Sequence, residues 1–424
     1  MSQIGILCLA ATGHLNTFLP LAQELQQRGH SITFFSSLEV QPKVEAFGFG
    51  FEAVCSNYSS SNENSGNQQQ SKGGLFNIRR TLQDFAVVAE SRLKNAPAII
   101  QSCGIDMLLV DLSVFEGGTI ADKLRVPYVT VCCLLPFYQD VAVPPIFTTR
   151  PYSLSGWSKL RNWFAYRLSR ELVRPIQQVI ASYRQRWQLP PQTNNNDYFS
   201  ELAIITRHIR EFEFPRQLPP HFHFTGPFHR SLSRSSISFP YEQLDSRPLV
   251  YASMGTLQNR SVSIFQQIAR ACVGLEAQLV ISLGGGLTPD ELPTLAGNPI
   301  VVSYAPQLEL LRRASLTITH AGLNTALESL SYGVPMVAIP ITDDQPGVAT
   351  RIRWTGAGEL VSVSQLDTLL KATIEKVLNI PTYKQNAMRL KRAIEETDGV
   401  NYACDVIEQV ISTGEVVTRP KIRE

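Results

Sequence analysis

Residues 3–35 read QIGILCLAATGHLNTFLPLAQELQQRGHSITFF, and this stretch decides the fold. An apolar run over residues 4–10 leads through a turn at Gly13 into a helix-periodic segment that ends near Gly29, and a second apolar run covers residues 31–35. Continuous apolar runs are typical of strands that are buried on both faces. Strand, helix and strand within about thirty residues form a βαβ unit, and its right-handed crossover predicts a parallel sheet.

The same alternation continues along the chain and then starts again. Strand-like runs follow at residues 107–110 and 128–132, with helical periodicity at 118–123 between them. The second series has a helix at residues 262–272 and strands at 249–253, 278–282, 300–303, 316–319 and 335–339. We therefore predict an α/β fold of two doubly wound parallel-sheet domains, with a ligand crevice between the carboxyl ends of their strands.

Changes in composition suggest the domain boundaries. We expect an N-terminal domain over residues 1–228, a linker rich in serine, arginine and proline over 229–247, and a C-terminal domain over 248–396. Residues 397–424 are expected to form a last helix and a polar tail that pack back on the N-terminal domain. The polar tract from Asn57 to Gly74 cannot bury a core and is predicted to be a mobile loop.

Composition excludes several classes of protein. The 424 residues carry 38 lysines and arginines against 36 aspartates and glutamates, a net charge of +2, whereas a dedicated nucleic-acid-binding domain is strongly basic. The seven cysteines contain no C-x-x-C pair, so buried free thiols are expected rather than a metal cluster or disulfides. Neither a membrane-spanning apolar run nor a signal-peptide pattern is evident, which predicts a cytoplasmic soluble protein.

The segment from Tyr304 to Gln345 carries the most chemical information. It contains YAPQ at residues 304–307, HAGLNTALE at 320–328, and Asp344-Gln345. A strand that ends at a histidine, followed by a glycine turn and a helix N-terminus, suits a pyrophosphate group. Each residue taken alone has a structural alternative, in which the histidine simply ends a strand and the asparagine caps a helix.

Taken together, these residues resemble the nucleotide-sugar signature of the UDP-dependent glycosyltransferases of GT-B architecture, which have two facing Rossmann-like domains. That signature reads x-P-Q, then H-x-G-x-N-[ST]-x-x-E, a proline and [DE]-Q. The resemblance implies a UDP-sugar donor, commonly UDP-glucose, and no required cofactor. Many relatives have tryptophan where this chain has Tyr304, which leaves the choice between uridine and thymidine open.

The resemblance also assigns a role to each part of the predicted donor site. Tyr304 would stack on the base, and Gln307 would contact the base or ribose. Glu328 would bind the ribose, and Asp344 with Gln345 would bind the sugar hydroxyls. His320, Asn324 and Thr325 would hold the diphosphate, helped by Ser253 and Thr256. The whole predicted donor set is Gly13, Ser253, Gly255, Thr256, Tyr304, Ala305, Gln307, His320, Gly322, Asn324, Thr325, Glu328, Asp344 and Gln345.

Two residues of the N-terminal half are the predicted catalytic pair. His14 follows the first strand and titrates near neutral pH, which suits a general base for an acceptor hydroxyl. It also resembles the family's G-H-x-x-P start, with Thr17 in place of the proline. Asp111 ends the strand at residues 107–110 and matches the family aspartate that orients the histidine. The alternatives are that Asp111 only caps a helix, or that Asp106, at the start of this strand, takes its place.

This pair implies a mechanism and its requirements. The acceptor oxygen would attack the anomeric carbon in line as the nucleoside diphosphate leaves, and this single displacement inverts the configuration. The leaving charge would be held by the helix terminus and His320. No D-x-D-like acidic pair suited to magnesium is present, so no metal site is predicted.

The acceptor is expected in the N-terminal half. The apolar stretch at residues 131–147 supplies a predicted pocket of Leu134, Pro136, Phe137, Tyr138 and Phe147. The segment from Trp157 to Trp187 is helix-like, basic and aromatic, and two interpretations remain open. It either lies on an anionic membrane as a peripheral contact, or packs its aromatic side on the domain with its arginines in solvent.

Most of the chain resembles the bacterial carotenoid glucosyltransferases. The segments that carry this likeness are ASMGTLQ at 252–258, DQPGVATRI at 344–352, LLP at 134–136 and IEQVISTG at 407–414. The likeness implies a lipophilic acceptor such as the hydroxylated carotenoid zeaxanthin, no nucleic-acid partner, and a monomer or weak dimer. A macrolide, polyphenol or sterol acceptor stays open, as do a sugar-nucleotide epimerase and a catalytically inactive binding protein. An NAD-dependent oxidoreductase is disfavoured because no first strand leads into G-x-G-x-x-G.

Overall fold

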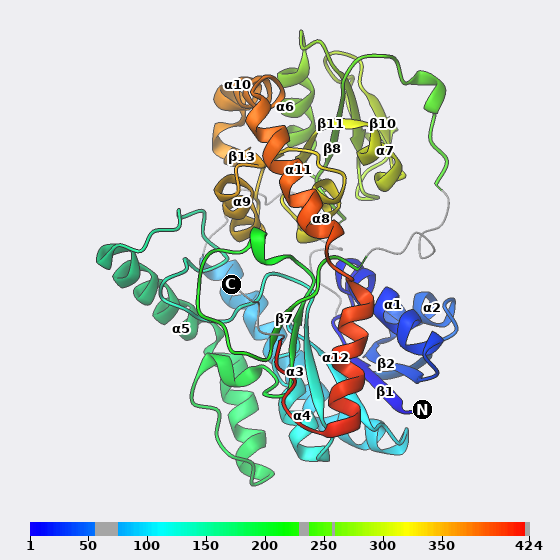
Figure 1. Cartoon of the computed structure of the whole chain (residues 1–424), viewed down its shortest axis with the longest axis vertical. Coiled ribbons are helices and arrows are strands. Elements are labelled where there is room, and N and C mark those ends of the chain that lie inside the picture. Colours follow the sequence, from blue (N-terminus) through cyan, green and yellow to red (C-terminus); the bar gives the residue numbers. More distant parts are fainter. Residues whose placement is uncertain (56–74, 229–236, 257–258, 420–424) are drawn as a thin grey trace.

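The computed structural model describes residues 1–55, 75–228, 237–256 and 259–419. These form two α/β domains, one above the other in Figure 1. The predicted loop from Asn57 to Gly74, residues 229–236 of the predicted linker, and residues 257–258 and 420–424 lie outside the described residues.

A seven-stranded parallel sheet forms the N-terminal domain, in the order β3-β2-β1-β4-β5-β6-β7. Its strands are β1 Gln3–Leu7, β2 Ser31–Ser37, β3 Gly50–Cys55, β4 Met107–Asp111, β5 Tyr128–Cys132, β6 Ile204–Thr206 and β7 Phe222–Phe224. The first strand ends earlier than the apolar run that predicted it. The reason is local, because the Leu9 backbone N–H donates to the Asp111 carboxylate (3.2 Å) and not to a neighbouring strand.

A six-stranded parallel sheet forms the C-terminal domain, in the order β10-β9-β8-β11-β12-β13. Its strands are β8 Leu249–Ser253, β9 Gln278–Ser282, β10 Ile300–Val302, β11 Ala314–Thr319, β12 Met336–Ala338 and β13 Gly358–Leu360. In both sheets the strand order reverses beside the first strand, between β1 and β4 and between β8 and β11. Such a reversal opens a crevice at the carboxyl ends of the strands.

Helices cover both sheets. Those of the N-terminal domain are α1 Thr12–Gln27, α2 Gln41–Glu45, α3 Leu75–Ser102, α4 Gly117–Leu124 and α5 Gly156–Arg186. The second series is α6 Val262–Cys272, α7 Gln307–Arg313, α8 Leu323–Ser331, α9 Gln345–Trp354, α10 Leu366–Asn379, α11 Pro381–Glu395 and α12 Val400–Thr413. In the described part of the chain, no helix combines the length and the apolar character needed to cross a membrane.

The two domains pack directly on each other. Leu135, Ile146 and Phe212 of the first domain share one apolar cluster with residues of α8, α9 and α11. Beside this cluster, Arg351 of α9 donates to the Glu213 carboxylate (2.5 Å), and both side chains are buried. A buried ion pair of this kind fixes the relative position of two surfaces, because losing either partner leaves an uncompensated charge.

The last helix returns to the N-terminal domain, as the red ribbon beside α1 in Figure 1 shows. Arg28 at the end of α1 donates to Asp405 (2.6 Å) and Glu408 (2.7 Å) of α12. Beyond the helix, the Val417 N–H donates to the Leu202 carbonyl (2.9 Å). The final segment therefore belongs structurally to the first domain.

All seven cysteines lie in described residues and are free thiols. Five are buried, whereas Cys103 and Cys272 are only partly buried, so the expectation of buried thiols is wrong for these two.

Candidate active site

A cavity of about 1380 Å³ lies where the carboxyl ends of the two sheets face each other. Every residue predicted above for the donor site, for the catalytic pair and for the acceptor pocket lines it. The two reversal points of strand order meet there. His14 follows β1 and Asp111 ends β4, while Ser253 ends β8 and His320 follows β11.

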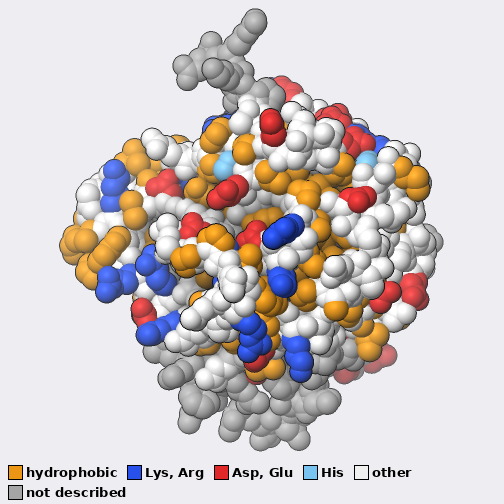
Figure 2. Space-filling model, turned by 90° about the horizontal axis from the view of Figure 1, so that it is seen from below, with side chains coloured by type: hydrophobic (Ala, Val, Ile, Leu, Met, Phe, Trp, Pro, Cys, Tyr) orange, Lys and Arg blue, Asp and Glu red, His pale blue; other side chains and the backbone are white. Residues whose placement is uncertain are grey.

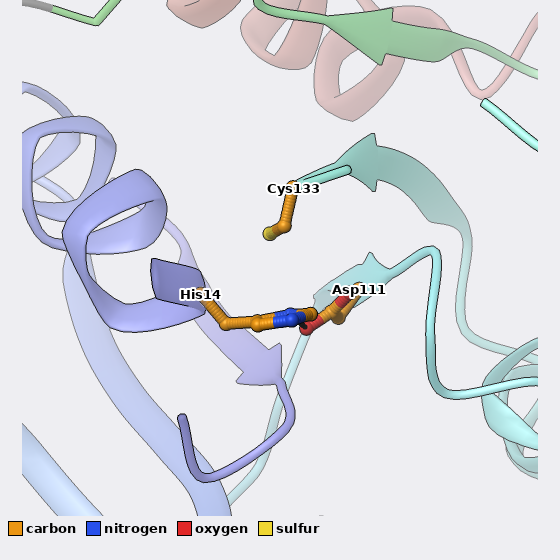
Figure 3. Close-up of side chains that lie close together, drawn as sticks. All are labelled: His14, Asp111 and Cys133. Atoms are coloured by element: carbon orange, nitrogen blue, oxygen red, sulfur yellow. Dashed lines mark hydrogen bonds and ion pairs between the residues drawn. The ribbon is translucent and has the colours of Figure 1, made fainter. Parts of the chain in front are cut away.

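His14 and Asp111 form a hydrogen-bonded pair from neighbouring strand ends. The imidazole Nδ1 lies 2.6 Å from the Asp111 Oδ2 (Figure 3). Asp111 is fully buried, and its carboxylate also accepts from the backbone N–H groups of Ser113 (2.9 Å) and Leu9 (3.2 Å). A carboxylate only accepts, so Nδ1 carries the proton and Nε2 keeps its lone pair. The aspartate thus orients the ring for proton abstraction at Nε2.

The electrostatics of the pair favour this role. Burial alone lowers the pKa of His14, but the carboxylate of Asp111, and to a lesser degree that of Asp344, raises it above its usual value. Burial alone raises the pKa of Asp111, but the charge and hydrogen bond of His14 lower it overall. A proton on His14 is therefore stabilised beside an ionised Asp111, which makes His14 a stronger base.

Asp106 lies at the other end of β4. Its carboxylate accepts from the Gln3 N–H (2.8 Å), at the start of β1 and away from the crevice. Of the two aspartates considered for the pair, only Asp111 contacts His14.

Cys133 completes a group that sequence reasoning did not single out. Within the described residues, His14, Asp111 and Cys133 are the three side chains whose ligand atoms converge closely enough to hold a metal ion (Figure 3). Burial and the nearby Asp111 raise the pKa of the Cys133 thiol well above its usual value. The thiol is thus protonated, and the imidazole and carboxylate are already paired, so the geometry favours proton transfer.

Two glycines make room for His320. A Cβ atom built on Gly255 would lie 2.5 Å from the imidazole Cε1, and one on Gly322 would lie 2.5 Å from Nε2. Ala321, between His320 and Gly322, has a left-handed backbone with φ of 65°. Strained residues of this kind are held in place by surrounding structure and are common at functional sites. Ala321 lies just before the N-terminus of α8, whose residues Asn324 and Thr325 line the cavity.

His320 is neutral near pH 7. Burial lowers the pKa of its imidazole to about 4, and an interaction with the backbone of Ser253 offsets this only in part. A neutral imidazole still donates one hydrogen bond. Our expectation that His320 helps hold the leaving charge therefore concerns a hydrogen bond and the helix N-terminus, because His320 brings no positive charge of its own.

The residues predicted for the base and ribose form a chain of hydrogen bonds. The Tyr251 hydroxyl donates to the Gln307 Oε1 (3.0 Å), and the Gln307 Nε2 donates to the Glu328 Oε2 (2.5 Å). Tyr304 is half exposed, and its hydroxyl lies where a Cβ atom on Gly285 would be. Gly285 has a φ of +78° and no side chain, so this residue, which follows β9, leaves room for the tyrosine ring.

Asp344 and Gln345 begin α9 beside the catalytic pair. The Leu135 N–H of the opposite domain donates to the Asp344 Oδ2 (3.0 Å). The Gln345 Oε1 accepts from the backbone N–H groups of Ile341 (2.8 Å) and Thr342 (3.1 Å), which holds its own loop in shape. Burial, together with the neighbouring Asp343, raises the pKa of Asp344 to about 6.

Arg207 is a residue that the sequence analysis missed. It follows β6 and is buried, and its guanidinium donates to the Asn324 Oδ1. The Asn324 Nδ2 in turn donates to the Gly13 carbonyl (3.3 Å). The predicted phosphate residue Asn324 is thus held by two segments of the other domain, the first turn of α1 and the residue after β6. The sequence gives little indication of this role, because a single arginine after a three-residue strand forms no recognisable motif.

The apolar side of the cavity extends beyond the residues predicted for the acceptor pocket. Besides the five predicted residues, apolar and aromatic side chains from α3, α5 and the loops after β4 and α5 line it. The main additions are Leu82, Phe85, Phe115, Tyr166, Val173, Ile176, Tyr198 and Phe199. They come from segments far apart in sequence, so no local pattern could have gathered them.

Comparisons with known proteins agree with this architecture. The family model described as UDP-glucoronosyl and UDP-glucosyl transferase matches residues 140–398. The zeaxanthin glucosyltransferase of Pseudescherichia vulneris is 30% identical over 99% of this chain and 100% of its own length. That of Pantoea ananas is 28% identical over 98% of each chain. The chain therefore belongs to the UDP-glucuronosyl and UDP-glucosyl transferase family.

Solved structures extend the comparison to the fold. The calicheamicin glycosyltransferase CalG4 superposes with a TM-score of 0.75 at 20% identity, covering 97% of this chain and 98% of its own. The kitacinnamycin glycosyltransferase superposes with a TM-score of 0.74. These likenesses confirm the predicted GT-B architecture. The protein is a glycosyltransferase that uses a nucleotide sugar and a small-molecule acceptor, and the epimerase and inactive-protein alternatives no longer apply.

Proposed function

We propose that the enzyme transfers glucose from UDP-glucose to a hydroxyl of a lipophilic acceptor, a hydroxylated carotenoid such as zeaxanthin, with inversion at the anomeric carbon. The observation that carries this proposal is the His14–Asp111 pair, located between an apolar wall and the proposed donor residues of one cavity. The zeaxanthin glucosyltransferases to which the chain is similar support the same acceptor class.

The proposed reaction is one displacement. His14 Nε2 takes the proton of the acceptor hydroxyl, and the oxygen forms a bond to the anomeric carbon. The bond from that carbon to the β-phosphate oxygen breaks, and its electron pair leaves with UDP. Asp111 stabilises the imidazolium that forms, while the N-terminus of α8 and the His320 N–H bind the leaving diphosphate. Because these groups supply both proton transfer and charge stabilisation, we propose that no metal ion is required.

Apolar lining supports a lipophilic acceptor. Phe115 and Phe137 stack with ring centroids 6.0 Å apart, and Tyr138 packs against Phe199 at 5.6 Å. Such a surface binds an extended hydrocarbon or a flat ring system by shape and burial, with few directional contacts. A macrolide, polyphenol or sterol would meet the same walls, so the acceptor is tested among all four.

The first experiment measures release of UDP from UDP-glucose with zeaxanthin in detergent micelles, beside a polyphenol, a macrolide and a sterol. Turnover fastest with zeaxanthin is expected. Turnover only with another aglycone would remove the carotenoid and leave the transferase chemistry. The anomeric configuration of the product is then read by NMR, where a β-glucoside is expected from the α-linked donor and an α-glucoside would refute inversion.

Two further arms test the donor and the metal. UDP-glucose is compared with dTDP-glucose, because Tyr304 is the ring proposed to stack on the base. Faster turnover with dTDP-glucose would replace the proposed donor. Activity is also measured after treatment with EDTA, and its loss, restored by magnesium, would refute a metal-free reaction.

A further inference from the structure

Helix α5 has two contrasting faces. Tyr166, Ser169, Val173 and Ile176 line the active-site cavity, and the Tyr166 hydroxyl donates to the Val143 carbonyl (3.1 Å). These positions recur at three- to four-residue spacing, so they form one side of the helix. This side of α5 therefore forms part of the proposed acceptor site.

The opposite face of the first half of α5 is apolar and exposed. Trp157 is 76% exposed, Phe164 is 58% exposed and Leu168 is 62% exposed. Leu160 lies between them at the same helical spacing, and together these four residues form what we call the outer stripe. Trp163, which packs edge-on against Phe164 at 4.9 Å, is also exposed. The interpretation in which the aromatic side chains of this segment pack on the domain is therefore wrong for Trp157, Trp163 and Phe164 and holds for Tyr166.

Exposed basic side chains lie in the same half of α5 as the outer stripe. Lys159, Arg167 and Arg170 are exposed, and the Arg167 guanidinium lies 5.6 Å from the Trp163 ring centroid. The acid in this part of the helix, Glu171, pairs with Arg174 (3.3 Å). The chain as a whole carries a net charge of only +2, so this excess is local. Figure 2 shows hydrophobic and basic side chains together at the left edge, the side on which α5 projects in Figure 1.

The exposed apolar and basic side chains of α5 together indicate which kind of surface this helix binds. Tryptophan and basic side chains around an apolar stripe match the interface of a bilayer with anionic headgroups, where rings lie at the headgroup level and cations pair with phosphates. A second copy of this chain would bring two basic rims together across an isologous contact, which like-charge repulsion disfavours. Charge complementarity therefore favours an anionic lipid surface over self-association.

We propose that the outer stripe of α5 docks the enzyme on anionic bilayers, with the helix lying in the interface plane. The opposite face of the same helix then borders the cavity, so an apolar acceptor passes from the lipid to the site along a short path. Phe147, which lines the cavity and is about half exposed, provides an apolar edge at the mouth. The proposal goes beyond the proposed transfer reaction and does not depend on which acceptor is used.

Vesicle flotation tests the proposal directly. The full-length enzyme is mixed with phosphatidylcholine vesicles that contain or lack phosphatidylglycerol. Binding to the anionic vesicles at low ionic strength is expected, with release by salt, because the electrostatic part is screened. The combined variant Lys159→Gln, Arg167→Gln, Arg170→Gln should reduce the affinity on the order of a hundredfold.

The apolar part is tested separately. The combined variant Trp157→Ser, Phe164→Ser, Leu168→Ser should lose binding that persists in high salt. Matched controls change exposed residues of the other domain, Leu369→Ser for the apolar set and Arg389→Gln with Arg392→Gln for the basic set, and should bind like the wild type. All variants should release UDP normally with a water-soluble acceptor, which shows that they are folded.

Three results would overturn the proposal. The first is no binding of the wild type to anionic vesicles, and the second is an equal loss in the control variants. The third is a wild-type dimer in sedimentation that the stripe variant makes monomeric, since this would assign the stripe to a second copy. Vesicle binding and sedimentation do not depend on the acceptor. A negative result with zeaxanthin would therefore refute the proposed acceptor without refuting membrane docking.

Discussion

The two walls of the active-site cavity differ in polarity. On the C-terminal side, polar groups from α7, α8 and the loops after β8, β11 and β12 supply the wall, and two of them, Gln307 and Glu328, are hydrogen-bonded to each other. On the N-terminal side, aromatic and aliphatic side chains from α3, α5 and the segment after β5 supply the wall. Polar recognition needs each group in one place, whereas an apolar wall recognises by shape and tolerates substitution.

The mainly apolar N-terminal side of the cavity also contributes three polar residues, which are His14, Asp111 and Arg207. All three lie close to the contact between the domains, where Asn324 reaches Gly13. We therefore expect substitutions of these three residues to change kcat or KM the most. Changes in the polar wall should have intermediate effects, and changes in the apolar wall should have the smallest.

Replacing His14 by alanine should have the largest effect. The variant loses the proposed base, so kcat should fall by about 10²–10⁴, the usual contribution of a general base. The donor KM should change little, because the polar wall remains. Initial-rate UDP release with saturating acceptor measures both constants.

His221→Ala is the matched control, because this histidine precedes β7 and does not line the cavity. Its turnover should equal that of the wild type. Unchanged kcat in His14→Ala would remove the imidazole as the base and leave the acceptor to be activated by another group.

The sequence predicted the residues of the polar wall from their spacing, and the structure brings them together at one cavity. The helix that begins near Asn324, the strand that ends before His320 and the pair Asp344 and Gln345 stand at fixed spacings because the chemistry needs them there. The central strands were equally clear, since burial on both faces leaves an uninterrupted apolar run.

The rest of the molecule carries weaker local signals. Strands β6, β7 and β13 have three residues each and lie at or near sheet edges, too short to show any period. Phe85, Phe115 and Tyr166 reach the cavity from three separate elements, and each resembles an ordinary core residue in its own segment. Tertiary packing, which no local pattern records, brings them together.

Arg207→Met should have the next largest effect. The guanidinium holds Asn324 at the start of α8, so the donor KM should rise about tenfold or more, as expected for a hydrogen bond with a charged group. Arg207 also lowers the pKa of His14. Removing the charge should raise that pKa, and the acidic limb of kcat/KM should move to higher pH. A pH–rate profile measures the shift.

Arg207→Lys separates the two roles, because it keeps the charge but loses the planar fork. Its KM should rise while the acidic limb stays near the wild-type position. Arg184→Met is the control for a buried arginine that bonds Thr119 and Asp122 away from the donor loops. An unmoved limb in Arg207→Met would show that Arg207 is only a structural link.

The polar wall itself should respond to pH through Asp344. Burial raises its pKa to about 6, so the carboxylate gains a proton as the pH falls below about 6 and loses its charge, which weakens the hydrogen bonds that it accepts from sugar hydroxyls. The donor KM should then rise about fivefold, the usual difference between charged and neutral hydrogen bonds. Asp344→Asn should show a raised KM that no longer varies with pH in this range.

Asp343→Asn is the matched test of the cause, because Asp343 helps raise the pKa of its neighbour. The transition in KM should move to lower pH in this variant while the KM at neutral pH stays unchanged. A transition that stays in place in Asp344→Asn would assign the titration to another group.

The smallest effect is expected from a single change in the apolar wall. Phe137→Leu removes a ring that stacks on Phe115 but keeps the position apolar, so the acceptor KM should rise only about threefold, within the range for volume-conserving swaps. The donor KM should stay constant. Phe49→Leu, in a core pair with Phe34 away from the cavity, should lower stability without changing either constant. A rise in the donor KM for Phe137→Leu would mean that the apolar wall also shapes the sugar site, and the division between the two walls would fail at the Leu135–Asp344 contact, where they meet.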